Sequence, residues 1–144
     1  MWTFEHSVAC ATDRGFAWKF WTNVENWPVV DPAVEAVSLD GAFAAGAIGT
    51  TKPLNMEPVN WTLVEVQDGE SAVVEITVPG ASAKFHWTFA DAEVGSTRIT
   101  QRATIEGENA DDYQEFGKGL EMGIPPGMQR LAEAIAQAAK QENS

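Results

Sequence analysis

The chain has 144 residues, 44% of them hydrophobic, and its 9 basic and 21 acidic side chains give a net charge of −12. This length predicts a single domain spanning residues 1–144, and the hydrophobic share excludes a disordered chain. The negative charge excludes nucleic acid as a partner, and because no stretch approaches the length of a bilayer span, no membrane insertion is expected.

Cys10 is the only cysteine in the sequence, so neither an intramolecular disulfide nor a cysteine-based metal cluster can form. The first residues lack the basic start and apolar run of a secretory signal, which predicts a cytoplasmic protein. Zinc-protease, calcium-loop, phosphate-loop and nucleophile-elbow motifs are missing from the sequence. We therefore expect no metal and no cofactor.

The N-terminal segment predicts one strand followed by short helices. Residues 2–10 alternate between two kinds of side chain, with Trp, Phe, His, Val and Cys on one parity, as in a half-buried strand. Asp13 has the character of an N-cap, and apolar residues at helical spacing follow it. Pro28 and Pro32 disfavour helix at the residues before them, which predicts two short helices and a turn.

The middle of the chain predicts an antiparallel meander. Short segments rich in β-branched and aromatic residues are separated by glycine-containing turn dipeptides such as Asp68-Gly69 and Pro79-Gly80. Because the connections are short, consecutive strands should pair antiparallel. The predicted strands cover residues 34–39, 48–52, 60–67, 72–78, 83–89 and 97–105.

The C-terminal segment predicts helix. Asp112 and Glu115 have the spacing of a capping box, and apolar residues at helical spacing follow them. Pro125 and Pro126 should interrupt or kink this helix, since proline supplies no interior N–H group. The apolar stripe resumes at Met128 and continues to about residue 140.

Four segments of the chain carry a resemblance to a known superfamily. They are residues 24–32 (VENWPVVDP), 37–49 (VSLDGAFAAGAIG), 61–66 (WTLVEV) and 95–100 (GSTRIT). Together with the order of predicted elements, they resemble the SRPBCC (START-like, helix-grip) superfamily, in particular its bacterial polyketide cyclase or dehydratase-like branch. The resemblance implies an α+β helix-grip fold: a curved antiparallel sheet of about seven strands wrapped around a long C-terminal α-helix, with two short helices between the first two strands.

The resemblance also implies a cavity between the sheet and the C-terminal helix for a small hydrophobic or aromatic molecule. Parity places Trp87 and Gln101 on inward faces of their strands, and a buried amide such as that of Gln101 needs a hydrogen-bond partner. Phe116, Leu120 and Ile124 could form a gate over the opening. The ligand-binding residues that we expect are Trp27, Phe43, Trp61, Trp87, Gln101, Phe116, Leu120, Ile124 and Met128.

Three functions remain open from the sequence. The first is binding of a small hydrophobic or aromatic metabolite by a monomer or homodimer. The second is a cyclase or dehydratase reaction in which either His6, the inward histidine, or a cavity carboxylate acts as the acid–base group. The third is a protein-interaction module, which needs an exposed apolar patch where Trp61 or Leu63 faces outward.

Overall fold

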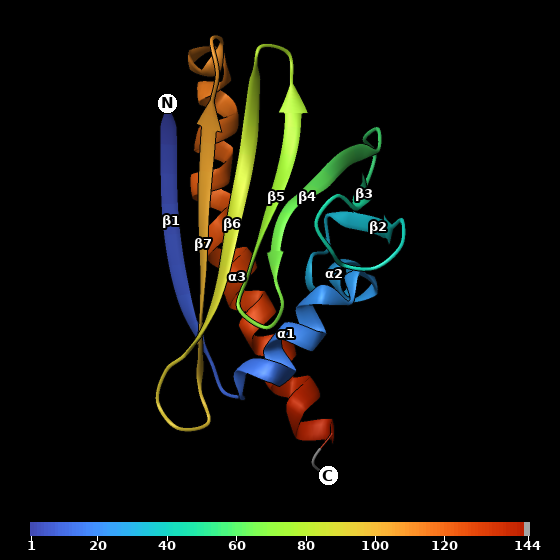
Figure 1. The fold of residues 1–144 in the computed structure, drawn as a ribbon, viewed down its shortest axis with the longest axis vertical. Helices are drawn as coiled ribbons and strands as arrows, with labels where there is room; N and C mark the ends of the chain where they lie inside the picture. The colour runs from blue at the N-terminus through green and yellow to red at the C-terminus, as the bar shows by residue number, and fades with distance from the viewer. Residues whose placement is uncertain (143–144) are drawn as a thin grey trace.

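The computed structural model describes residues 1–142, and its strands form one seven-stranded antiparallel sheet in the order β1-β7-β6-β5-β4-β3-β2 (Figure 1). The strands are β1 (Trp2–Cys10), β2 (Val34–Leu39), β3 (Ile48–Pro53), β4 (Val59–Gln67), β5 (Ser71–Val78), β6 (Ala81–Asp91) and β7 (Thr97–Glu106). The helices are α1 (Arg14–Thr22), η1 (Val24–Asn26), α2 (Trp27–Val30), η2 (Ala110–Tyr113) and α3 (Gln114–Glu142).

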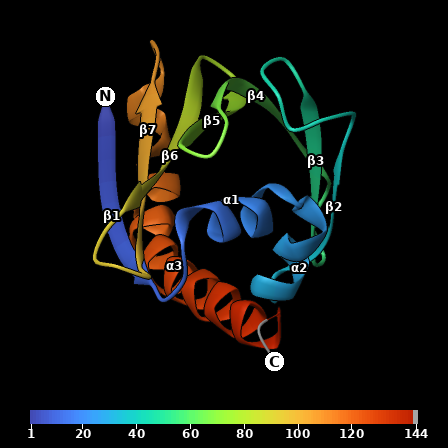
Figure 2. The same cartoon turned by 60° about the horizontal axis from the view of Figure 1, so that its bottom comes forward.

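The sheet curves around α3, which is 29 residues long (Figure 2). α1 and α2 follow β1 and lie on the same concave side of the sheet as α3 (Figure 2). This arrangement confirms the predicted α+β helix-grip fold. No helix within residues 1–142 is long and apolar enough to cross a bilayer.

Local sequence signals fix several boundaries. The Oδ1 atom of Asp13 accepts a hydrogen bond of 2.8 Å from the N–H of Phe16, which confirms the predicted N-cap of α1. Gly80 has a φ of +73° in the two-residue turn between β5 and β6, a conformation that glycine adopts without a steric penalty. The predicted capping box at Asp112 is wrong, because Asp112 lies inside the 3₁₀ turn η2 and α3 begins only at Gln114.

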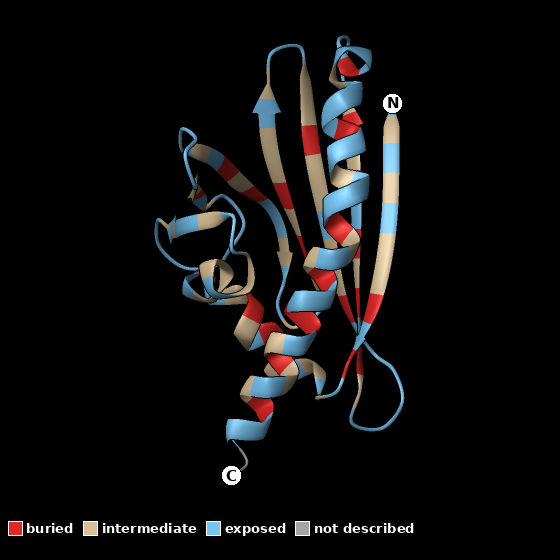
Figure 3. Cartoon of the chain, turned by 180° about the vertical axis from the view of Figure 1, so that it is seen from behind, coloured by how far each residue is buried: buried red, intermediate tan, exposed pale blue. Residues whose placement is uncertain are grey.

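The proline pair does not interrupt α3. Pro125 and Pro126 both lie inside the helix, whose axis changes direction part-way along its length (Figure 3). Each proline removes an N–H that would bond the carbonyl four residues earlier, which here belongs to Glu121 or Met122. Both of these residues are exposed, so the lost hydrogen bonds fall on the solvent side of the helix.

The predicted inward faces of β6 and β7 are confirmed. Phe89 is 1% exposed, whereas His86 of the opposite parity is exposed. On β7 the inward residues are buried in alternation with exposed or half-buried ones. Parity fails on β4, where a register shift between Leu63 and Glu65 leaves both Val64 and Glu65 exposed.

The outward patch that the interaction-module hypothesis needed at Trp61 or Leu63 is not formed. Trp61 is 3% exposed and Leu63 is 0% exposed, so both side chains point into the protein. Because the bulge falls after Leu63, it carries the next residues to the solvent side without moving Trp61 or Leu63.

Candidate functional site

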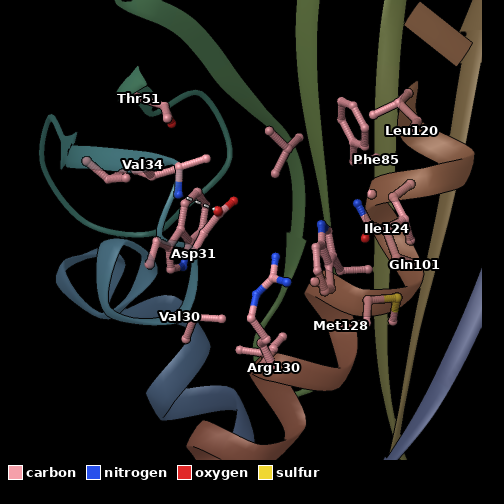
Figure 4. A pocket seen from close by; sticks show the side chains of 18 of the residues that line it. Val30, Asp31, Val34, Thr51, Phe85, Gln101, Leu120, Ile124, Met128 and Arg130 are labelled. Carbon is pink, nitrogen blue, oxygen red and sulfur yellow. Dashed lines mark hydrogen bonds between the residues drawn. The ribbon is translucent and has the colours of Figure 1, made fainter. Parts of the chain in front are cut away.

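A cavity of about 550 Å³ lies between the sheet, α2 and the middle of α3 (Figure 4). Its volume falls within the usual range for sites that bind small molecules. Most of the lining side chains are apolar. The lining consists of Trp21, Trp27, Val30, Asp31, Ala33, Val34, Val37, Thr51, Trp61, Val74, Ile76, Phe85, Trp87, Gln101, Gly119, Leu120, Gly123, Ile124, Gly127, Met128, Arg130 and Leu131.

Four tryptophans form a continuous row along the wall of the cavity. The ring centroids of Trp87 and Trp21 lie 5.0 Å apart, those of Trp21 and Trp27 5.9 Å, and those of Trp27 and Trp61 5.2 Å. Trp27 donates its indole N–H to the carbonyl of Trp21 (2.6 Å), and Trp61 donates its own to Thr51 Oγ1 (3.0 Å). Because these two N–H groups are bonded within the protein, the indoles of Trp27 and Trp61 are held in place as part of a preformed aromatic wall.

The side of the cavity formed by α3 carries glycines. Gly119, Gly123 and Gly127 recur at four-residue intervals, so they share one face of the helix. A Cβ atom added at Gly119 or Gly123 would meet no heavy atom within 4 Å outside its own helix backbone and chain neighbours. Gly119, Gly123 and Ala33 are exposed, which locates the mouth of the cavity between α3 and the α2–β2 connection.

Gln101 brings a polar group to the inner, sheet side of the cavity, where Figure 4 shows it near Phe85 and Ile124. The residue is only 7% exposed. Within residues 1–142, no hydrogen bond to its side-chain amide is formed. An amide in this position can donate to and accept from a molecule in the cavity.

Asp31 and Arg130 are the charged residues of the lining, on opposite sides of the mouth (Figure 4). Asp31 Oδ1 accepts a hydrogen bond of 2.9 Å from the N–H of Ala33, which fixes the carboxylate to its own turn. Arg130 is exposed and makes no ion pair or hydrogen bond with any residue of the described chain.

The comparisons with known proteins agree with this architecture. Residues 1–141 match the sequence profile of the family described as polyketide cyclase/dehydrase and lipid transport. The chain belongs to this family. The match confirms the resemblance to the SRPBCC superfamily, and it covers the sheet, the cavity and all of α3 but its last residue. No curated protein matches the sequence.

Solved structures share the fold of this family member at low sequence identity. A point mutant of norcoclaurine synthase from Thalictrum flavum has a TM-score of 0.72 at 16% identity, over 99% of this chain and 96% of that one. The di-domain ARO/CYC protein StfQ of the steffimycin pathway has a TM-score of 0.74 at 15% identity, over 96% and 52%. A Thermobifida fusca protein solved by NMR has a TM-score of 0.73 at 20% identity, over 95% of each chain.

Seven of the nine expected ligand-binding residues line the cavity: Trp27, Trp61, Trp87, Gln101, Leu120, Ile124 and Met128. Phe43 does not line it. Its ring packs edge-on against Trp21 (5.3 Å) and Trp18 (6.1 Å) and so belongs to the packed core. Phe116 does not line it either, because it lies one turn before Leu120, beyond the end of the cavity, and is 38% exposed.

His6 has the predicted inward parity but lies outside the cavity lining. It is half-buried and pairs in register with Gln101 across β1 and β7. β1 is the edge strand beyond β7 and contributes no residue to the lining. The candidate acid–base group is therefore separated from the cavity by the width of a strand.

Cys10, the lone thiol, is part of the packed core. Burial raises the pKa of this thiol to about 11, and its Sγ donates to the carbonyl of Ala132 at 3.6 Å. A thiol in this state is a poor nucleophile. No group of three or more His, Cys, Asp or Glu side chains within residues 1–142 is arranged to hold a metal ion.

Sequence reasoning missed the glycine face, Asp31, Arg130 and the role of Trp21 in the wall. The sequence did contain a signal for the glycine face. Gly119, Gly123 and Gly127 repeat every four residues, and each of them directly precedes a residue that we expected in the lining. Arg130 follows Gly127 by three residues and lies on the same side of the helix. Trp21 carried no comparable signal, since an apolar ring on α1 fits a filled core equally well.

Proposed function

We propose that this protein binds one small, flat, hydrophobic or aromatic molecule in the cavity between the sheet and α3. The row of Trp87, Trp21, Trp27 and Trp61 along an open space of about 550 Å³ is the observation that carries this proposal. Stacked and edge-on contacts with preformed indole faces favour an aromatic ring system over a branched aliphatic one.

The apolar lining supplies the main favourable contribution to the binding free energy. An aromatic group the size of a tryptophan side chain buries about 150–250 Å² of surface. At about 25 cal/mol per Å², this burial contributes roughly 4–6 kcal/mol before the cost of lost freedom on association. Gln101, at the inner side, would orient the ligand through a hydroxyl or carbonyl group, and Trp27, Leu120, Ile124 and Met128 would hold its apolar body.

The cavity supports binding better than catalysis. The described residues that line it include Asp31 and Arg130 as ionisable groups, and one carboxylate oxygen of Asp31 is engaged by the N–H of Ala33. His6 lies outside the lining. A structure of norcoclaurine synthase that contains dopamine and hydroxybenzaldehyde supports the view that this fold can accommodate aromatic molecules.

A matched pair of variants on α3 tests the proposal. N-phenyl-1-naphthylamine, a neutral apolar fluorophore, should bind the wild-type protein at one saturable site and quench its tryptophan fluorescence. Gly123→Phe places a ring in the cavity and should weaken binding by at least about 30-fold, or roughly 2 kcal/mol. Met122→Phe, at a neighbouring position that is 79% exposed and outside the lining, should leave affinity within about twofold.

Two results would contradict binding in the cavity. The first is a probe signal that rises without saturation, which is typical of weak adsorption to surface patches. The second is an equal loss of affinity in Gly123→Phe and Met122→Phe, because only Gly123 lines the cavity. Thermal unfolding of each variant serves as the control for folding.

A further inference from the structure

Arg130 extends from α3 at the mouth of the cavity, on the side opposite Asp31 (Figure 4). Its Nη2 atom would lie 3.7 Å from a Cβ placed on Gly127, so the guanidinium is folded back over the glycine face of the helix. Arg130 is the one basic residue in the lining of the described chain.

The guanidinium has no partner in the protein although acidic residues outnumber basic ones 21 to 9. The ion pairs within residues 1–142 engage Arg14, Lys52, Lys84 and Lys118, and none of them involves Arg130. The five N–H donors of Arg130 are therefore available to a molecule that occupies the cavity. Their planar arrangement matches a carboxylate or sulfonate through two parallel hydrogen bonds.

Asp31 is the charge that faces Arg130 across the mouth. The two residues form no ion pair within 4 Å, and Asp31 Oδ1 is held by the N–H of Ala33. The carboxylate thus leaves the guanidinium free, but its own charge opposes an incoming anion. This opposition predicts that removing the charge of Asp31 strengthens the binding of anions.

From this geometry we infer that the cavity selects aromatic acids: an apolar ring system lies against the tryptophan row, and a carboxylate or sulfonate group meets Arg130 at the mouth. The inference rests on the proposed function, since it requires that the cavity takes an aromatic ligand. It goes further by assigning the charge of that ligand and the residue that recognises it. In a protein with a net charge of −12, a local cation is needed to overcome repulsion of an anionic ligand.

Two fluorescent probes with the same ring skeleton separate charge from shape. 8-Anilinonaphthalene-1-sulfonate carries a sulfonate, whereas N-phenyl-1-naphthylamine is its neutral counterpart. Arg130→Gln should weaken binding of the sulfonate probe about tenfold and leave the neutral probe within about twofold. Asp31→Asn should strengthen binding of the sulfonate probe by about threefold, with little effect on the neutral one.

Arg102→Gln is the matched control, because it removes the same charge from an exposed position on β7 outside the lining. It should change neither affinity by more than about twofold. Arg130→Lys keeps the charge but loses the planar donor arrangement, so the sulfonate probe should bind this variant with intermediate affinity.

The outcomes distinguish the two proposals. If neither probe binds the wild-type protein at a saturable site, the proposed function fails, and this inference fails with it. If both probes bind but Arg130→Gln weakens them equally, or changes neither, the cavity binds aromatic molecules without selecting acids, and the inference alone is overturned. Unchanged binding of the neutral probe also reports that the cavity of each variant is intact.

Discussion

The space between the sheet and α3 is filled at one end and hollow at the other, and the same helix forms one wall of both parts. In the filled part, α3 presents Ala132, Ile135 and Ala139, which are all buried against the core. In the hollow part it presents Gly119, Gly123 and Gly127 to the cavity. The two parts differ in what borders the helix: the buried side chains of the filled part lie on another face of α3 than the three glycines, which mark the side where the closed core becomes a binding space.

The tryptophans show the same difference between the filled part and the hollow part. Trp18 is 6% exposed, meets Phe89 edge-on at 5.4 Å and donates its indole N–H to Asp68 Oδ1 at 3.0 Å. It belongs to the core and does not line the cavity. Trp61 is 3% exposed and yet lines the cavity. Low exposure alone therefore does not separate a core ring from a wall ring.

Substitutions of two isoleucines on α3 test this difference and should have the largest effect on the free energy of unfolding. Ile135→Ala deletes a side chain that is 0% exposed in the filled part, and it should lower the free energy of unfolding by about 3–4 kcal/mol. Ile124→Ala acts on a residue that already borders the cavity, so fewer packing contacts are lost and the expected cost is about 1–2 kcal/mol. Urea unfolding measures both values. Equal costs would mean that the hollow part is as closely packed as the filled one.

Alanine substitutions at two glycines on α3 should change the free energy of unfolding by a smaller amount, and one of them should raise it. Gly123→Ala adds a Cβ where no atom lies within 4 Å, so improved helix propensity should raise the free energy of unfolding by about 0.5–1 kcal/mol. Gly117→Ala adds a Cβ only 3.0 Å from Trp2 Cε2, and the resulting crowding should cancel or reverse the gain. Chemical denaturation of both variants measures the difference.

A loss of stability in Gly123→Ala similar to that in Gly117→Ala would show that the space beside Gly123 is not free. A gain in Gly123→Ala alone would indicate that the chain keeps a glycine there at the expense of stability, as expected for a position that serves the cavity.

Much of the fold follows from side-chain alternation and turn chemistry. The strand at residues 34–39 was predicted with the boundaries that it has, and the inward residues of β6 and β7 follow from parity. One exception has a local cause: the bulge after Leu63 adds a residue that no alternation reveals. The proline pair was expected to interrupt or kink α3, and the helix continues through it with a change of axis direction.

The candidate site could be predicted only in part, because a cavity is a property of packing among distant segments. The spacing of Leu120, Ile124 and Met128 locates the face of α3 that meets the sheet. Whether Phe43 or Trp21 reaches the cavity depends on how the two rings pack against each other, which the sequence does not encode locally. The lack of a partner for Arg130 became visible only in three dimensions.

The most direct test of the account is fluorine NMR of protein labelled with 5-fluorotryptophan, recorded with and without saturating N-phenyl-1-naphthylamine. Tryptophan-to-phenylalanine variants assign the resonances of the six tryptophans. The account predicts large shifts for the four tryptophans that line the cavity, Trp21, Trp27, Trp61 and Trp87, and no shift for Trp2, which lies outside it. A spectrum in which Trp2 shifts as much as the lining tryptophans, or in which none of them moves, would contradict a ligand-binding cavity at this site.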